Sequence, residues 1–315
     1  MNTAAISQPV DEHLPEIVAN QLRRAELHCV LAGFPKCGTT SLAHWMNSCP
    51  SISVSNPKET FLLCREHRRQ GEIAAEGELA KCFSDSGESV RVEASTLNAY
   101  SDVLQECVAE RDDIKVILIY RDPVDAVVSW HQQVVQADQA FDIDFDRSWQ
   151  HACDAFDQKK IIPLMQDYVR VCRHGSSIQR WIEVLGHDRV LVLRMDELSD
   201  NDSDLANRVN RFFDGRTTLS GQPPTLNQFA SIRFHGFYKA FKKSGFNQAL
   251  RAMERCFPVA GHVRRVTKEN FFRRKAVKPQ ESASQATLRA FFADDHELAH
   301  RIRDENLRHW EQGGD

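Results

Sequence analysis

One lysine and three hydroxyl residues are grouped at positions 33–41, in the sequence GFPKCGTTS, directly after an apolar run. Lys36 carries a full positive charge, and the hydroxyls of residues 39–41 can each donate a hydrogen bond. An apolar strand, a glycine-bounded loop and a helix start form the arrangement that binds phosphate, because the first amides of a helix lack partners within it. The segment therefore predicts a phosphate-binding loop. A strand–helix turn without a ligand is the alternative, and this grouping of donors disfavours it.

The position of the lysine separates this loop from that of an ordinary ATPase. The two glycines have the spacing of the P-loop motif, but Thr39 stands where an ATPase carries its lysine. The lysine that is present, Lys36, lies earlier and inside the loop. The pattern favours a phosphate-bearing ligand other than ATP–Mg²⁺.

A second group of polar residues follows the apolar run Lys115–Tyr120, which reads as a strand buried on both faces. Arg121 comes directly after this strand, and Ser129 follows eight residues later on a predicted helix that starts at Pro123. A guanidinium fork matches the oxygens of a phosphate group. Arg121 and Ser129 are therefore candidates for a second phosphate site. A structural ion pair of Arg121 with Asp122 or Asp125 is an equal alternative.

Together the two sites resemble the sulfotransferase family that uses 3′-phosphoadenosine 5′-phosphosulfate. Positions 34–41 look like the family's 5′-phosphosulfate loop, and positions 121–129 look like its 3′-phosphate motif. Weaker similarity covers residues 57–61, 93–100 and 181–198, so that the resemblance spans most of residues 27–312. The carbohydrate-type branch, which includes bacterial members, is the most similar.

The resemblance implies a reaction. The donor would be 3′-phosphoadenosine 5′-phosphosulfate (PAPS), the product adenosine 3′,5′-bisphosphate, and no metal would be needed. Lys36 would bind the 5′-phosphosulfate and neutralise charge on the leaving group, residues 39–41 would hold the 5′-phosphate, and Arg121 and Ser129 would hold the 3′-phosphate. The expected donor contacts are Lys36, Cys37, Gly38, Thr39, Thr40, Ser41, Arg121, Ser129, Arg264 and Arg265.

Sulfuryl transfer also needs a base that accepts the proton of the acceptor hydroxyl. Glu59 is the first candidate, because the carbohydrate-type branch has a glutamate base at this place and because neighbouring lysines would keep it ionised. A surface pair with Lys58 is the alternative reading. Glu93 is the reserve candidate and His131 the third.

The sequence departs from the family pattern at three positions. Ala126 replaces an arginine that is frequent in the 3′-phosphate motif, and Ala94 replaces a lysine that some carbohydrate-type members carry. Ser41 stands where small-molecule sulfotransferases have a tryptophan, which removes an obvious adenine stacker. In the basic stretch 262–278, Arg264 and Arg265 would close over the nucleotide, with a solvated surface as the alternative. Cys37 is expected only to fill space.

Short apolar runs alternate with helical patterns along the chain, which predicts an α/β fold: a three-layer sandwich with a central parallel sheet and a P-loop-type strand–loop–helix. The expected strands are residues 27–32, 52–54, 89–93, 115–120 and 190–193, and the expected helices include residues 16–24, 66–83, 147–185, 202–213 and 284–310, with a long loop at 215–235. Residues 1–26 are expected to form an N-terminal extension, and residues 27–312 a single domain.

Composition excludes several protein classes. The net charge of −4 argues against a general nucleic-acid or membrane-surface binder. No apolar run approaches the roughly 20 residues that span a bilayer. The nine scattered cysteines contain no C-x-x-C pair, and with no export signal we expect free thiols in the cytoplasm. The expected partner is a carbohydrate, lipid or small-molecule acceptor sulfated on a hydroxyl or, less favourably, an amine. A small-molecule kinase using ATP–Mg²⁺ and a non-catalytic nucleotide-binding module are the alternatives.

Overall fold

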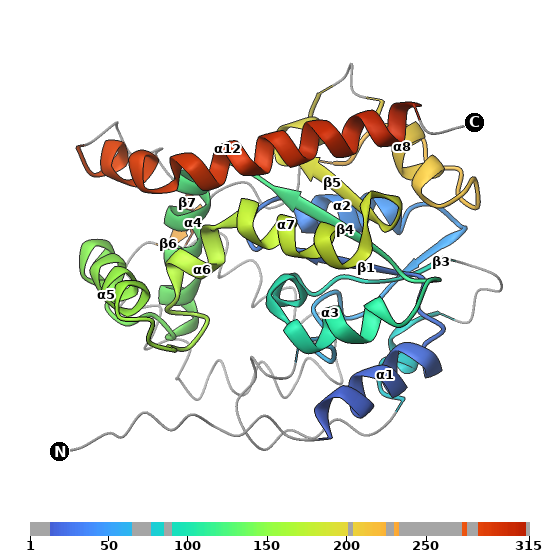
Figure 1. Cartoon of the computed structure of the whole chain (residues 1–315), viewed down its shortest axis with the longest axis horizontal. Helices are drawn as coiled ribbons and strands as arrows, with labels where there is room; N and C mark the ends of the chain where they lie inside the picture. Colours follow the sequence, from blue (N-terminus) through green and yellow to red (C-terminus); the bar gives the residue numbers. More distant parts are fainter. Residues whose placement is uncertain are drawn as a thin grey trace.

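The centre of the molecule is a five-stranded, all-parallel sheet (Figure 1). The computed structural model describes residues 13–64, 77–84, 90–200, 204–224, 230–232, 273–275 and 283–312. In sheet order the strands are β2 (Ile52–Val54), β3 (Val90–Glu93), β1 (Cys29–Gly33), β4 (Lys115–Tyr120) and β5 (Val190–Arg194). All residues of β1 are buried, as expected for a parallel sheet that is covered on both faces.

Helices cover both faces of the sheet, so the predicted three-layer α/β sandwich is confirmed. On one face lie α1 (Leu14–Arg24), α3 (Asp102–Ala109), α4 (Pro123–Ala137), α6 (Tyr168–Cys172) and α7 (His174–Leu185), with α5 (Phe145–Asp157) packed outside α4 and α6. On the other face lie α2 (Thr39–Met46) and α8 (Leu205–Phe212). The alternation along β4 divides its side chains between the two apolar cores: Val116 and Leu118 enter the first, Ile117 and Ile119 the second.

Short elements complete the described part of the chain. The 3₁₀ turns are η2 (Ala80–Cys82), η3 (Thr96–Tyr100), η4 (His187–Arg189) and η5 (Met195–Leu198). The segments β6 (Ala230–Ile232) and β7 (Arg273–Lys275) pair antiparallel as a separate two-stranded sheet. None of the helices within the described ranges combines the length and the apolar composition required to cross a bilayer.

The long helix α12 (Ala283–Gln312) closes the open edge of the sheet at β5 (Figure 1). Asn306, which is fully buried, accepts a hydrogen bond from the amide of Val192 (2.9 Å) and donates to the carbonyl of Val190 (2.8 Å). The indole of Trp310 donates to the same carbonyl at 3.1 Å. Unpaired backbone groups at a sheet edge are a liability, because they need partners once water is excluded. One helix here replaces the missing neighbouring strand.

Several sequence-based boundaries agree closely with the structure, and one expected helix does not. The strand predicted at residues 115–120 is β4 without change, and the expected start of a helix at Pro123 is the first residue of α4. The helix expected over residues 147–185 is instead divided into α5, α6 and α7. Lys159 adopts a positive φ of 51°, and Pro163 follows, so that the chain leaves helical geometry between α5 and α6.

Other expectations fall partly or wholly outside the described residues. Of the helix expected at residues 66–83, the structure describes only residues 77–83, which contain η2. The expected loop at 215–235 is described over 215–224, where it contains neither helix nor strand, and over 230–232, where it forms β6. In the basic stretch 262–278 only β7 is described.

The described part of the N-terminal extension is packed on the domain. The helix expected at residues 16–24 is α1, which starts at Leu14 and lies against α3. Its apolar side chains Val18 and Leu22 are fully buried in the larger of the two cores. Removal of α1 would therefore expose the apolar surface of α3 that it covers.

The contacts of Asn306 lead to a first prediction. The substitution Asn306→Leu keeps the branching of the side chain but enlarges it and leaves the buried amide of Val192 without its partner, while the carbonyl of Val190 keeps only the indole of Trp310. We expect the free energy of unfolding to fall by about 2–4 kcal/mol, because the unsatisfied buried amide costs about 1–3 kcal/mol and the larger side chain adds packing strain of about 1–3 kcal/mol. Urea unfolding followed by circular dichroism measures the loss. Glu305→Gln, at the exposed neighbouring position, should change the midpoint little, and an equal effect of both substitutions would contradict the assignment.

Candidate active site

The predicted phosphate-binding loop, residues 33–41, lies at the carboxyl ends of β1 and β4. The amide of Phe34 donates to the carbonyl of Ile119 (2.8 Å), which continues the pairing of the two strands into the loop. In parallel sheets ligands bind outside the carboxyl ends of the strands, and the loop occupies that place. The helix α2 then begins at Thr39, and its first-turn amides receive no side-chain cap from Gly38. The helix N-terminus therefore presents backbone donors to an anion.

Gly38 is required by the geometry of this loop. Its φ is +92°, in the left-handed region that residues with a side chain rarely adopt. A Cβ atom at this position would also lie 2.9 Å from Cδ1 of Leu198 and 3.2 Å from Cγ of Met195. Both side chains belong to η5, at the end of β5. The glycine thus permits both the turn and the close approach of the loop to the neighbouring strand end.

Arg121 joins the second motif to the loop. Its Nη1 donates to the carbonyl of Lys36 (3.2 Å), and its Nη2 pairs with Oδ2 of Asp125 (2.7 Å). The ion pair proposed as the alternative reading therefore exists, but it holds the guanidinium against the phosphate-binding loop. Ser129 is buried on α4, one helical turn beyond Asp125 and on the same helix face. Asp122 caps α4 by accepting hydrogen bonds from the amides of residues 124 and 125.

Glu59 is brought to the loop by a short chain of contacts. Its Oε2 accepts hydrogen bonds from the amide (2.9 Å) and the hydroxyl (3.3 Å) of Thr96, and its Oε1 accepts one from Nζ of Lys58 at 2.5 Å. The same ammonium donates to Oγ1 of Thr39 (3.4 Å) and to the carbonyl of Ala94 (2.9 Å). The carboxylate is therefore linked, through one lysine, to the first residue of α2. One third of the Glu59 side chain remains exposed, so it is open to a ligand.

Glu93, the reserve base, lies in a different environment. The carboxyl group is fully buried and accepts hydrogen bonds from Thr60 (2.6 Å), from the hydroxyl and amide of Ser95 and from the amide group of Asn98. Burial raises its pKa, and the hydrogen bonds from Ser95 and Thr60 act in the opposite direction. These contacts link Thr60, the residue after Glu59, to the segment that contains Ser95 and Asn98. Glu93 itself has no exposed surface from which to receive a proton.

His131, the third candidate, is also a structural residue in this arrangement. It is buried on α4, and its ring nitrogens contact the hydroxyl of Tyr168 (2.8 Å) and the carbonyl of Ile143 (3.1 Å). Burial lowers the pKa of the imidazole. The side chain links α4 to α6 and to the loop before α5.

Behind the loop, Phe34 and Cys37 pack against the buried ring of His174 at the start of α7. The ring centroids of Phe34 and His174 are 4.5 Å apart, and Nε2 of the histidine lies 3.9 Å from Sγ of Cys37. Burial raises the pKa of the thiol to about 12, so that Cys37 is neutral and packs as a small apolar side chain. Arg264 and Arg265 lie outside the described residues.

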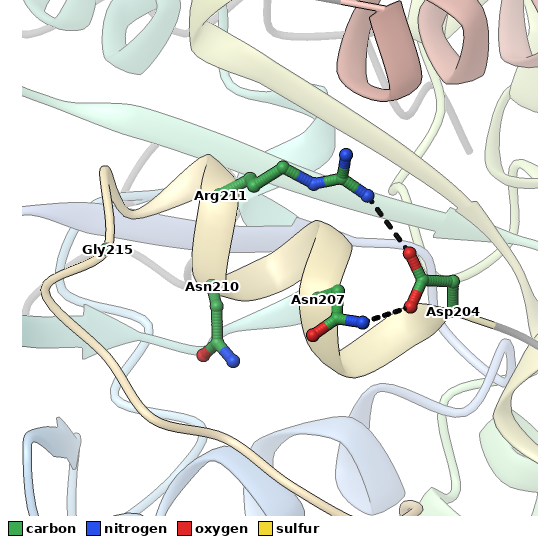
Figure 2. Close-up of a pocket in the computed structure, with 5 residues that line it drawn as sticks. All are labelled: Asp204, Asn207, Asn210, Arg211 and Gly215. Carbon is green, nitrogen blue, oxygen red and sulfur yellow. Dashed lines mark hydrogen bonds and ion pairs between the residues drawn. The ribbon is translucent and has the colours of Figure 1, made fainter. Parts of the chain in front are cut away.

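A separate polar hollow of about 460 Å³ lies on α8, lined by Asp204, Asn207, Asn210, Arg211 and Gly215. Figure 2 shows Arg211 and Asn207 both directed at the carboxylate of Asp204, which compensates the guanidinium charge. Lys115, the first residue of β4, donates to the carbonyl of Phe212 (2.6 Å). This contact holds the end of α8 at the amino-terminal edge of the sheet, away from the loop. This hollow is not part of the loop site.

The described residues contain no group of three or more His, Cys, Asp or Glu side chains suited to a metal ion.

Lys58 is the residue that sequence reasoning missed. The sequence suggested Lys58 as a cation that keeps Glu59 ionised or as its surface partner, but the side chain is only 20% exposed and also contacts Thr39 and Ala94. Position gave a weak signal, since Lys58 directly precedes the candidate base. Its contacts to Thr39 and Ala94 depend on the sheet order β2-β3-β1, which local spacing does not reveal.

Comparisons with known proteins show the family and the fold of this chain. Residues 26–294 match the family model described as a sulfotransferase domain. Among solved structures, the fold is similar to the crystal structure of a sulfotransferase from Alicyclobacillus acidocaldarius, with a TM-score of 0.61 and 16% sequence identity. That similarity covers 90% of this chain and 98% of the other. A search of curated proteins found no match.

The buried histidine leads to a second prediction. Burial lowers the pKa of His174 to about 4, from an ordinary value of 6.5. The unfolded chain therefore binds a proton at this residue near pH 6.5, and the folded chain does so only near pH 4. The free energy of unfolding must fall as the pH is lowered through this interval, by up to roughly 3 kcal/mol from this residue.

Urea unfolding at a series of pH values between 7 and about 4 measures this dependence. The slope of the free energy of unfolding against pH gives the number of protons taken up on unfolding. His174→Gln should lower that number by close to one, whatever its effect on stability at pH 7. His44→Gln, at an exposed position on α2, is the matched control. An unchanged slope in His174→Gln would show that His174 does not titrate in this interval.

Proposed function

The chain belongs to the sulfotransferase domain family, and from this premise we propose that it transfers a sulfuryl group from PAPS to a hydroxyl group of a carbohydrate, lipid or small-molecule acceptor. The observation that carries the proposal is the meeting of three separate segments at one edge of the sheet. The loop at Lys36 contacts Arg121, and its helix start at Thr39 contacts Lys58, the neighbour of Glu59. The proposed donor site and the proposed base for the acceptor are thus side by side.

The residues present fit a donor with two separated anionic groups. The loop and the first turn of α2 supply backbone amides, hydroxyls and Lys36 for the 5′-phosphosulfate. Arg121, held by Asp125 against the loop, supplies the guanidinium for the 3′-phosphate, with Ser129 on the same helix face as Asp125. A 3′-phosphate distinguishes this donor from ATP. We propose that residues 27–312 form a single catalytic domain on which α1 packs.

The reaction is a single in-line displacement. The acceptor oxygen forms a bond to sulfur while the bond from sulfur to the bridging oxygen of the donor breaks, and that electron pair leaves with adenosine 3′,5′-bisphosphate. Glu59 accepts the hydroxyl proton, and Lys36 stabilises the charge that develops on the leaving oxygen. Alignment and charge stabilisation carry most of the catalysis in such group transfers.

Removal of the loop lysine gives a third prediction. Lys36→Ala should lower the rate of transfer from ³⁵S-labelled PAPS to a panel of sugars, lipid headgroups and phenols by roughly 10²–10³-fold, because the leaving oxygen loses its cation. Thermal unfolding checks that the fold is retained, and Lys81→Ala, at an exposed lysine paired with Glu78, serves as control. Transfer at the native rate in Lys36→Ala would refute the role of Lys36. In parallel calorimetry, we expect adenosine 3′,5′-bisphosphate to bind more tightly than ATP–Mg²⁺.

The candidate base gives a fourth prediction. Glu59→Gln keeps the size and much of the hydrogen bonding of the side chain but cannot accept a proton at neutral pH. We expect the turnover rate to fall by roughly 10²–10⁴-fold. The affinity for adenosine 3′,5′-bisphosphate, which does not contain the reacting group, should change little. Glu78→Gln, at a partly exposed glutamate, is the matched control. Full activity in Glu59→Gln would move the role of base to another group.

A further inference from the structure

Lys58 lies between the two groups that must contact the two substrates. Its Nζ is 2.5 Å from Oε1 of Glu59 and 3.4 Å from Oγ1 of Thr39. In the proposed function, Glu59 contacts the acceptor hydroxyl and Thr39 contacts the phosphosulfate end of the donor. An ammonium that bonds to both groups must be close to the place where the acceptor oxygen and the sulfuryl group meet.

The position of this ammonium does not depend on Glu59 alone. Its third contact is the carbonyl of Ala94, at 2.9 Å. Ala94 lies between Glu93 and Ser95, which the buried hydrogen bonds of the Glu93 carboxylate hold in place. A lysine side chain loses considerable rotamer freedom when it is fixed, so a position with three acceptors and one-fifth exposure is specifically maintained.

We propose that Lys58 is a catalytic residue whose ammonium is shared between Glu59 and the transferring sulfuryl group, in addition to the cation of Lys36. This inference rests on the proposed function. Before transfer the ammonium pairs with the ionised carboxylate of Glu59. When the acceptor proton moves to that carboxylate, the negative charge on Glu59 disappears, and the ammonium stabilises the charge on the sulfuryl and leaving oxygens.

The step is balanced without any further reactant. The hydroxyl proton of the acceptor goes to Glu59, the acceptor oxygen becomes bonded to sulfur, and the electron pair of the broken bond leaves on the 5′-phosphate of adenosine 3′,5′-bisphosphate. Lys58 remains protonated throughout and changes only its partner. Its electrostatic contribution therefore grows as Glu59 is neutralised, which is the property that lowers a barrier rather than only strengthening binding.

The test separates chemistry from binding with Lys58→Met, Lys58→Arg and the surface control Lys81→Met. Single-turnover transfer from ³⁵S-labelled PAPS and calorimetric affinity for adenosine 3′,5′-bisphosphate, which has no sulfuryl group, are measured for each variant. We expect Lys58→Met to lower the transfer rate by about 10²-fold while the affinity changes by less than about threefold. Lys58→Arg, which keeps the charge, should recover about tenfold of the lost rate. Lys81→Met should match the native protein in both measurements.

Two results would overturn the inference. Native transfer in Lys58→Met would show that the ammonium does not act on the reacting group. A loss of bisphosphate affinity in the same proportion as the loss of rate, without recovery in Lys58→Arg, would show that Lys58 only maintains the start of α2. Failure of the proposed function has a different signature, because the native protein would then neither bind adenosine 3′,5′-bisphosphate nor transfer a sulfuryl group from PAPS. In that case the inference would be rejected together with the proposed function.

Discussion

The close packing of Gly38 on η5 is the constraint on which the site depends. The positive φ of this residue disfavours a side chain, and a Cβ atom there would lie 2.9 Å from Cδ1 of Leu198, so that the loop packs against the end of β5 as well as joining β1 and β4. A loop held from only one side could change its backbone conformation freely. Here the first amides of α2 keep one orientation, which is the condition for preorganised binding of an anion.

The η5 turn that supports Gly38 is itself fixed by a buried ion-pair cluster. Glu197 in η5 is 5% exposed and pairs with Arg208 of α8 at 2.5 Å and with Arg303 of α12 at 3.0 Å. Buried ion pairs contribute little net stability compared with apolar residues, but they require one specific arrangement of their partners. The cluster therefore connects α8 and α12 to the phosphate-binding loop through Leu198. This route gives the long C-terminal helix a part in shaping the site.

Local patterns in the sequence predicted the elements of this fold better than their contacts. The apolar run of β4 and the residues around Gly38 carry their own signals, because a strand buried on both faces and a glycine-bounded loop are local features. The pairing of Lys58 with Thr39 arises from the order of β2, β3 and β1, which places distant segments side by side. The break between α5 and α6 did carry a local signal, Pro163, which the helix expected over residues 147–185 did not take into account. For Lys58, tertiary packing decided what local spacing left open.

The site concentrates cationic side chains although the net charge of the whole chain is negative. The chain carries a net charge of −4, yet the loop gathers Lys36, Lys58 and Arg121 against the carboxylates of Glu59 and Asp125. At physiological ionic strength, screening limits interactions between exposed charges to about 8 Å, so exposed charges farther away contribute little at this place. Glu59 pairs with Lys58 and Asp125 with Arg121. In the proposed function, an anionic donor would be attracted by a few fixed side chains close to it, and the rest of the surface is free to carry the opposite sign.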